Sequence, residues 1–133
     1  MSAILGIEDR LAILELLARA DDAASRRDVP GYLALFTAEA VLDGAEGTHR
    51  GLAELAAVVP KVWAAEPSGT RHLTLNAIVD PQPRSDGGVT ATSTLLIVQP
   101  GSPPAIVTMS AIEHELVSTR GVWSFRRRTV KGG

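Results

Sequence analysis

Apolar residues at the start of the chain recur at the spacing of one helix face. The recurring positions are three or four residues apart, and they are Ile7, Leu11, Leu14, Ala18, Asp21 and Ser25. This pattern predicts an amphipathic helix over Ile7–Arg27 that packs on a core. The face ends in two polar residues, Asp21 and Ser25, which makes this end of the helix a candidate part of a site.

Two further helices and a short strand are predicted before Thr70. Asp28 is a residue type that caps helices, so a second, shorter helix begins there. Apolar spacing predicts a third helix from Leu52 to Ala65, which Pro60 should bend or interrupt. Between these helices, residues 41–42 favour a strand and residues 44–51 favour a loop.

From Thr70 onward the period of the pattern changes to two, which is the period of strands. Turn-forming segments interrupt this alternation at residues 81–88, 100–104 and 119–121. These breaks delimit four strands, over residues 72–79, 89–98, 106–117 and 122–130. Long neighbouring strands joined by short loops form an antiparallel meander. Helices followed by strands predict an α+β fold, in one domain over residues 1–133.

Composition excludes several classes of protein. The chain has 133 residues, of which 45% are hydrophobic and 21% charged, so it can bury a core and is not disordered. A net charge of −2 argues against a nucleic-acid partner, and the lack of cysteine excludes disulfides and thiol nucleophiles. No apolar stretch is long enough to cross a membrane, and the run Ala3–Leu5 follows no basic segment, so no secretory signal is predicted. We therefore expect a cytoplasmic protein.

Several segments, taken in order, resemble those of a known family. RRDVPGYLALFTAEAVLDG follows the first helix, and THRG, RHLTLN and GVWSFRRR come after it. Over residues 7–130 the chain resembles the SnoaL-like, scytalone-dehydratase-like group of the nuclear-transport-factor-2-like superfamily. The resemblance implies a cone, in which N-terminal helices pack on a strongly curved, mostly antiparallel sheet that encloses an apolar pocket. It also implies a homodimer.

His72 is the first candidate for catalysis. The resemblance places it at the pocket histidine that serves dehydratase-like members as a general acid/base, together with an aspartate of the first helix. Histidine suits the removal of a proton from carbon because it titrates near neutral pH. Strand alternation puts His72, Thr74 and Asn76 on one face. That polar row lines a pocket or, alternatively, faces solvent.

The anionic partner of this histidine departs from the family's pattern. The family's catalytic aspartate falls at Ser25 here, and another polar residue of the first helix falls at Ala20. Neither side chain supports the positive charge of His72 as a carboxylate does. Asp21 lies one turn before Ser25 on the same stripe, and Asp22 is next to it. A relocated dyad of His72 with Asp21 or Asp22 is one interpretation, and an exposed acidic pair is the other.

Seven further residues are candidates for substrate binding through hydrogen bonds, apolar contact or charge. They are Ser25, Asn76, Phe36, Trp63, Ile112, His114 and Arg127. His114 shares the phase of Ile112 on its strand, so it faces the pocket or serves a structural role in the core. Arg127 is in phase with Trp123 and Phe125, so it binds an anionic group at the pocket rim or belongs to a solvated edge.

These residues favour an enzyme that performs acid/base chemistry at carbon, as a dehydratase, isomerase or cyclase, on a small apolar or oxygenated organic molecule. No cofactor is expected, and no metal, because the three histidines are far apart and no metal-ligand spacing occurs. The alternative is a non-catalytic ligand-binding, dimerisation or partner module of the same fold, since Ser25 replaces the helix-1 aspartate.

Overall fold

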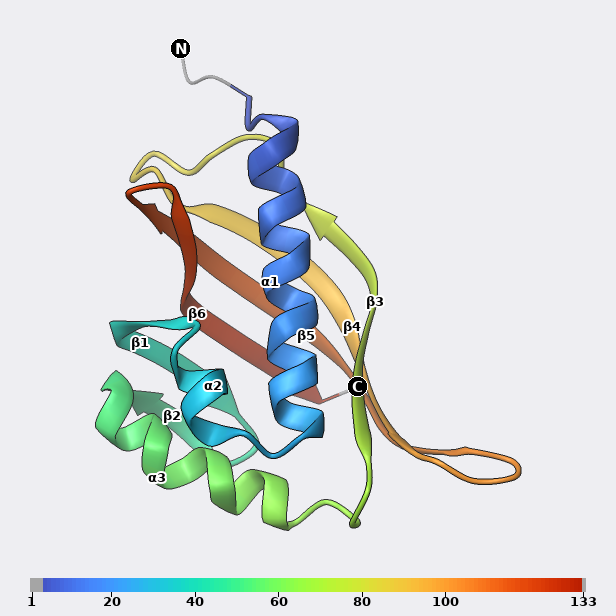
Figure 1. Cartoon of the computed structure of the whole chain (residues 1–133). Coiled ribbons are helices and arrows are strands. Elements are labelled where there is room, and N and C mark those ends of the chain that lie inside the picture. The colour runs from blue at the N-terminus through green and yellow to red at the C-terminus, as the bar shows by residue number, and fades with distance from the viewer. Residues whose placement is uncertain (1–3, 133) are drawn as a thin grey trace.

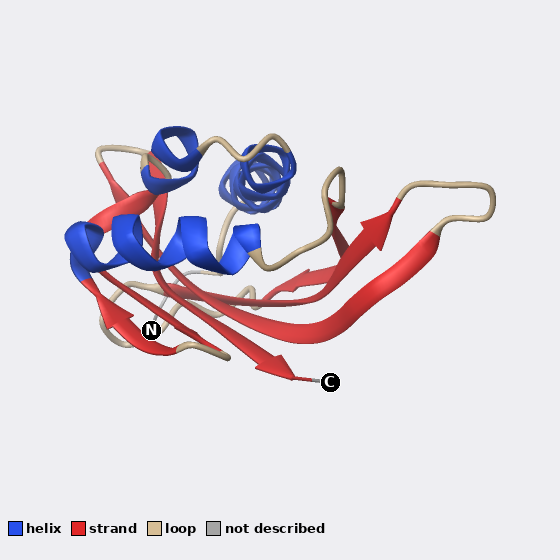
Figure 2. Cartoon of the chain, turned by 90° about the horizontal axis from the view of Figure 1, so that it is seen from below, coloured by secondary structure: helices blue, strands red, loops and turns tan. Residues whose placement is uncertain are grey.

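Three helices lie against one face of a curved six-stranded sheet (Figures 1 and 2). The structure is a computed structural model that describes residues 4–132. In this range the helices are α1 (Ile7–Ser25), α2 (Val29–Leu33) and α3 (Gly51–Ala64). The strands are β1 (Phe36–Gly44), β2 (Gly47–Arg50), β3 (Arg71–Val79), β4 (Val89–Gln99), β5 (Ala105–Thr119) and β6 (Val122–Gly132). The predicted α+β class is confirmed.

The sheet is mostly antiparallel and does not close on itself, with strand order β2-β1-β6-β5-β4-β3. β3 to β6 form the predicted meander, in which each strand pairs with the next in antiparallel orientation. β1 joins β6 in parallel orientation. Part of the predicted loop forms β2 instead, because a tight turn at Gly44–Gly47 brings residues 47–50 back along β1.

α1 lies across the sheet (Figure 1) and packs on it with a different face from the one predicted. Ile7 and Leu11 of the predicted stripe are 83% and 59% exposed. The buried stripe consists of Ile13, Leu16, Leu17, Ala20, Asp21, Ala23 and Ala24. Both stripes have helical spacing, and the alanines of the second one let the helix approach the sheet closely. Asp21 belongs to both stripes and is buried, so it is not part of an exposed acidic pair, which was one of the two interpretations that the sequence left open.

The two later helices begin close to their predicted positions. Asp28 caps α2 by accepting a hydrogen bond from the backbone N–H of Gly31 at 2.9 Å. α3 continues through Pro60 to Ala64, so the predicted interruption does not occur. Proline removes only one N–H from the helical ladder, and the turns on both sides of it remain helical. Within residues 4–132, no helix has the length and apolar character needed to span a bilayer.

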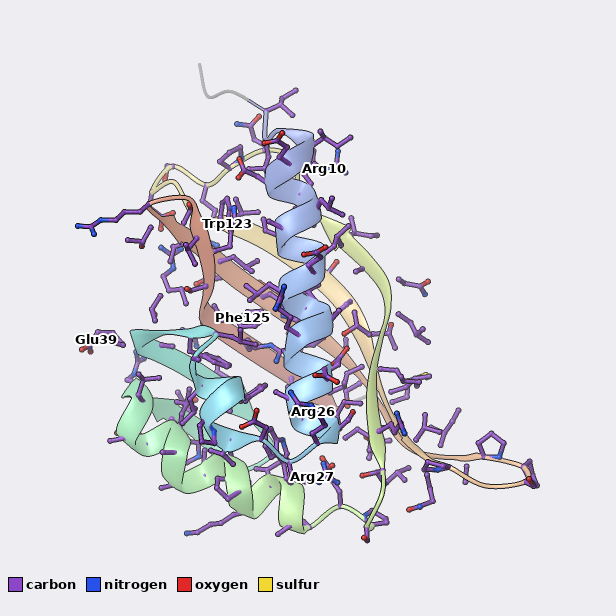
Figure 3. The ribbon with its side chains drawn as sticks, viewed as in Figure 1. Arg10, Arg26, Arg27, Glu39, Trp123 and Phe125 are labelled. Carbon is purple, nitrogen blue, oxygen red and sulfur yellow. The ribbon has the colours of Figure 1, made fainter. Side chains whose placement is uncertain are left out.

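The core gathers aromatic rings from α2, β1, α3 and β6. The ring of Tyr32 lies 5.0 Å from that of Phe36 and 5.2 Å from that of Trp63. Phe36 in turn lies 5.2 Å from Phe125, a fully buried residue of β6 (Figure 3). A separate small cluster of Leu95, Ile97 and Ile112 lies on β4 and β5. The two clusters leave a space between the helices and the concave face of the sheet.

Candidate functional site

That space is a cavity of about 400 Å³. Its apolar wall includes Val58, Val59, Val62, Leu95, Ile97 and Ile112. Titratable side chains from different elements interrupt the wall, among them Asp21, Glu66, His72 and Arg128. The hairpin that joins β1 to β2 forms part of the rim. A mostly apolar cavity with a few convergent polar groups is typical of a site for a small organic molecule.

His72 lies on β3 and lines this cavity, with 9% of its surface exposed. Its ring Nε2 is 2.9 and 3.0 Å from the two carboxylate oxygens of Glu66. The carboxylate partner of His72 is therefore Glu66, and not Asp21 or Asp22 as the sequence suggested. A neutral imidazole bonded in this way donates its Nε2 proton to the carboxylate and keeps a lone pair on Nδ1.

Glu66 is held from its other side by Arg27. Nη1 of Arg27 donates to Oε1 of Glu66 at 2.8 Å, and Nη2 donates to the Thr70 hydroxyl at 2.7 Å. Burial raises the pKa of Glu66, but the hydrogen bond and charge of His72, together with the Arg27 guanidinium, outweigh it and lower that pKa. Glu66 is thereby kept as the anion that an imidazolium requires.

The end of α1 aims Arg27 at this carboxylate. The N–H of Asp28 donates to the carbonyl of Ala23 at 2.9 Å, and the N–H of Arg27 to that of Ala24 at 3.1 Å. This is the pattern of a Schellman helix end, which needs a residue in the left-handed region. Arg27 has a φ of 58° there, where glycine is the usual residue. Its bonds to Glu66 and to the Ala24 carbonyl offset the strain, and Arg27 lies close to the segment that joins α3 to β3 (Figure 3).

Asp21 enters the cavity from α1, and 9% of its surface is exposed. Its carboxylate accepts a hydrogen bond from the hydroxyl of Thr74, two residues beyond His72 on β3. Burial raises the pKa of Asp21, against the opposing effects of Thr74, Arg128 and His72. The cavity thus holds two carboxyl groups with opposite tendencies, because Glu66 is favoured as the anion while Asp21 keeps its proton to higher pH.

Two predicted site residues at the end of α1 lie outside the cavity. Asp22 is on the exposed side of the helix, where Arg26 donates to it at 3.0 Å. Helical geometry points neighbouring side chains in different directions, so only Asp21 faces inward. Ser25 accepts a hydrogen bond from the backbone N–H of His72 at 2.9 Å. It joins α1 to β3 and does not line the cavity.

Asn76 is exposed, although strand alternation placed it beside His72. The pairing of β3 with β4 shifts register between Leu75 and Ile78, and Asn76 has a φ of 54° at that irregularity. Such a bulge turns the following side chains away from the face that alternation assigns to them. The predicted polar row therefore ends at Thr74.

The apolar candidates divide between the core and the cavity. Trp63 and Ile112 line the cavity, as predicted. Phe36 packs between Tyr32 and Phe125 in the core and is not among the lining residues.

His114 is fully buried beneath the cavity and is not part of its lining. Its Nε2 lies 2.9 Å from the hydroxyl of Ser93, and its Nδ1 accepts a hydrogen bond from Nε of Arg128 at 3.3 Å. Burial and the Arg128 charge lower the pKa of His114 to about 2. It is a neutral structural histidine, which was one of the two roles that the sequence left open.

The arginine in the cavity is Arg128 and not the predicted Arg127. Arg127 lies on the other face of β6, where it donates to Asp43 at 2.8 Å. The register between β5 and β6 shifts at this point, with Leu116 opposite Phe125 and Glu115 opposite Arg127. The extra residue at this bulge reverses the alternation, so Phe125 and Arg128 both face inward.

Sequence reasoning missed Glu66 and Arg128. Glu66 follows the last turn of α3, next to the segment that ends the helix, and no periodicity specifies where such a side chain points. Its only signal was a carboxylate six positions before the candidate histidine, across a turn. Arg128 was concealed by the bulge, which a strict period of two does not reveal. Within residues 4–132, no cluster of three or more His, Cys, Asp or Glu side chains is arranged to hold a metal ion.

The fold and cavity place the protein in the class of α+β cones with a cystatin-like fold. Within this class, the chain belongs to the SnoaL-like domain family, whose model matches residues 6–129. The resemblance drawn from its segments is thereby confirmed. No curated protein matches the chain in sequence.

Solved structures with the same fold cover almost the whole chain. A protein of unknown function with a cystatin-like fold from Nostoc punctiforme is 25% identical, with a TM-score of 0.87 over 98% of this chain and 95% of its own. ActVI-ORFA from Streptomyces coelicolor is 21% identical, with a TM-score of 0.80 over 92% and 96%. A Novosphingobium aromaticivorans protein provisionally designated a scytalone dehydratase is 17% identical, with a TM-score of 0.78 over 96% and 85%. At these identities the likeness establishes the fold.

Proposed function

We propose that this protein catalyses acid/base chemistry at a carbon atom of a small, largely apolar organic molecule, as a dehydratase, isomerase or cyclase. The observation that carries the proposal is the contact between Nε2 of His72 and the Glu66 carboxylate, at 2.9 Å, in the wall of the cavity. A carboxylate in this position fixes the tautomer of the imidazole and stabilises the imidazolium that forms when the ring accepts a proton.

In this mechanism His72 is the general base. Nδ1, the ring nitrogen that Glu66 does not hold, takes the proton from the substrate carbon. Asp21 is the candidate general acid, because a carboxyl with a raised pKa retains a proton that it can deliver to a departing or developing oxygen. The apolar wall around them excludes water, which strengthens the electrostatic effect of both groups. None of these steps requires a cofactor.

The scytalone dehydratase designation of one neighbour suggests dehydration. The non-catalytic alternative remains the second candidate. Its basis was that Ser25 replaces the carboxylate partner of His72. Glu66 supplies that carboxylate, so this argument for the alternative no longer applies.

Solvent deuterium exchange into 2-tetralone tests the proposal before the substrate is known. This bicyclic ketone has acidic C–H groups next to its carbonyl, and NMR follows their exchange in D₂O. The wild-type protein should accelerate exchange above buffer, and His72→Ala should slow the protein-dependent rate by about 10²-fold. His49→Ala is the matched control, because His49 also lines the cavity but bonds only to the Glu46 backbone carbonyl, at 3.1 Å. Exchange that is absent in the wild type, or unchanged in His72→Ala, would favour the non-catalytic module.

A further inference from the structure

Arg128 brings a positive charge to the inner wall of the cavity. It lies on β6, lines the cavity and is 4% exposed. Its Nη1 donates to the hydroxyl of Tyr32 at 2.9 Å, and its Nε donates to Nδ1 of His114 at 3.3 Å. Its Cζ lies 4.5 Å from the ring centroid of Phe125. The guanidinium is therefore fixed in one orientation by uncharged partners.

The charge of this buried guanidinium is not balanced by a contacting carboxylate. Among residues 4–132, no carboxylate oxygen lies within 4.0 Å of its nitrogens. The half-buried arginines Arg27, Arg126 and Arg127 each have such a partner. Asp21 is close enough for the Arg128 charge to lower its pKa, but it does not contact the guanidinium. Removing a charge from water without an opposite charge in contact with it is unfavourable.

The remaining nitrogen of Arg128 is open to the cavity. The hydrogen bonds to Tyr32 and His114 use Nη1 and Nε, which leaves Nη2. In the described part of the chain, no fully buried side-chain nitrogen or oxygen lacks a hydrogen-bond partner. A nitrogen of Arg128 without a protein partner is consequently one that a molecule in the cavity can reach. His114 cannot supply a competing charge, because its low pKa keeps it neutral.

We propose that the natural ligand of this cavity is an organic anion whose charged oxygen, a carboxylate or a phenolate, binds Nη2 of Arg128. The ligand would thereby supply the direct anionic contact that no carboxylate of residues 4–132 makes with Arg128, through a charge-assisted hydrogen bond. This proposal rests on the proposed function, in that the same cavity receives the substrate, and it narrows the substrate class to organic acids.

The positions of Arg128 and His72 also constrain the size of the ligand. β6 and β3 are separated in the sheet by β5 and β4, and neighbouring strands lie about 4.8 Å apart. The two residues also differ in position along the strands, because Arg128 is in register with Ala91 of β4 through His114, whereas His72 pairs with Ile97. A ligand whose charged oxygen binds Arg128 while a carbon approaches His72 must bridge this separation, less the inward reach of both side chains. Its apolar part therefore lies against the apolar wall of β4 and β5, with its charge and its reacting carbon at opposite ends.

Paired probes that differ only in charge test this inference. Calorimetry should show that the wild-type protein binds 2-naphthoate about tenfold or more tightly than the neutral 2-naphthamide. Arg128→Gln should abolish the preference. Arg127→Gln is the matched control on the adjacent residue, which faces the other side of β6 and pairs with Asp43, and it should retain the preference.

The comparison of 2-naphthoate with 2-naphthamide on the wild-type protein tests the proposal even where Arg128→Gln fails to fold. Arg128→Lys keeps the charge and should retain a preference for 2-naphthoate. Equal affinity of the wild type for the two probes, failure to bind either, or a preference that survives in a folded Arg128→Gln would overturn it. His72→Ala should also retain the preference, because His72 is not part of the anion contact. A wild-type protein that prefers 2-naphthoate but does not accelerate deuterium exchange would refute the catalytic role alone. A wild-type protein that accelerates exchange but shows no such preference would refute the anion site alone.

Discussion

Nε2 of His72 lies 2.9 Å from a carboxylate oxygen of Glu66, a residue of the segment between α3 and β3 and not of α1. The family pattern implied a carboxylate on the first helix, where this chain has Ser25. The same chemical pair is assembled here from a different element, and Arg27 at the end of α1 secures it. A carboxylate next to a pocket histidine therefore does not depend on one position in the chain.

Asp21, the candidate general acid, should lower the free energy of unfolding at neutral pH. Burial raises its pKa in the folded state above the ordinary value of 3.8, so the unfolded chain releases this proton at lower pH. Folding therefore loses stability as the pH rises from 3.8 through the folded-state pKa. Asp21→Asn should raise the melting temperature relative to wild type more at pH 7 than at pH 3.5, and it should slow 2-tetralone exchange. Asp22→Asn, on the exposed side of α1, is the control, and equal shifts at both pH values in Asp21→Asn would contradict the assignment.

His114 should make the protein less stable at acidic pH. Its folded-state pKa is about 2, against 6.5 for the free side chain, so below pH 6.5 only the unfolded chain takes up a proton. The free energy of unfolding should fall by about 1.4 kcal/mol per pH unit from this residue, or about 2 kcal/mol between pH 6.5 and pH 5. Urea denaturation of wild type and His114→Gln at pH 7 and pH 5 isolates this contribution. A stability difference between the two proteins that does not shrink at pH 5 would show that His114 is charged in the fold.

Ser25 should matter for stability and not for binding. Ser25→Ala leaves the backbone N–H of His72 without its partner and should lower the free energy of unfolding by about 1–2 kcal/mol, as urea denaturation measures. The affinity of the folded variant for 2-naphthoate should remain unchanged, because Ser25 does not line the cavity. A loss of affinity at unchanged stability would restore its predicted role as a substrate ligand.

The convex face of the sheet is the surface on which we expect the homodimer to form. Leu73 on β3 pairs with Leu96 on β4, which pairs with Met109 on β5, and together they form an apolar row on the face opposite the cavity. Farther along β5, this face becomes charged at Glu113. Light scattering should find a dimer for the wild type and for Glu113→Gln, and a monomer for Met109→Lys. A monomeric wild type, or a Met109→Lys dimer, would contradict this expectation.

Sequence periodicity specified the elements of this fold well because helices and strands impose different periods. The four strands after Thr70 occur within a few residues of their predicted ends. The choice of the buried face of α1 failed because two overlapping stripes satisfy the same spacing, and only packing against β3 and β6 distinguishes them.

The site was less predictable because its geometry depends on irregular backbone. His72 and Trp63 were found from residue type and phase, and both line the cavity. The bulges that displace Asn76 and bring Arg128 inward interrupt the alternation on which phase depends. Glu66 follows a helix end, where no repeat constrains the direction of a side chain.

The most direct test of the account is a double-mutant cycle on deuterium exchange of 2-tetralone, with wild type, His72→Ala, Glu66→Gln and the double variant. The side chain in Glu66→Gln still accepts a hydrogen bond but carries no negative charge to stabilise the imidazolium, so we expect slower exchange without loss of the fold. If the two residues act as one base, the double variant should be no slower than His72→Ala alone. Exchange in Glu66→Gln that equals wild type, or losses that multiply in the double variant, would contradict the pairing of His72 with Glu66 as the catalytic base.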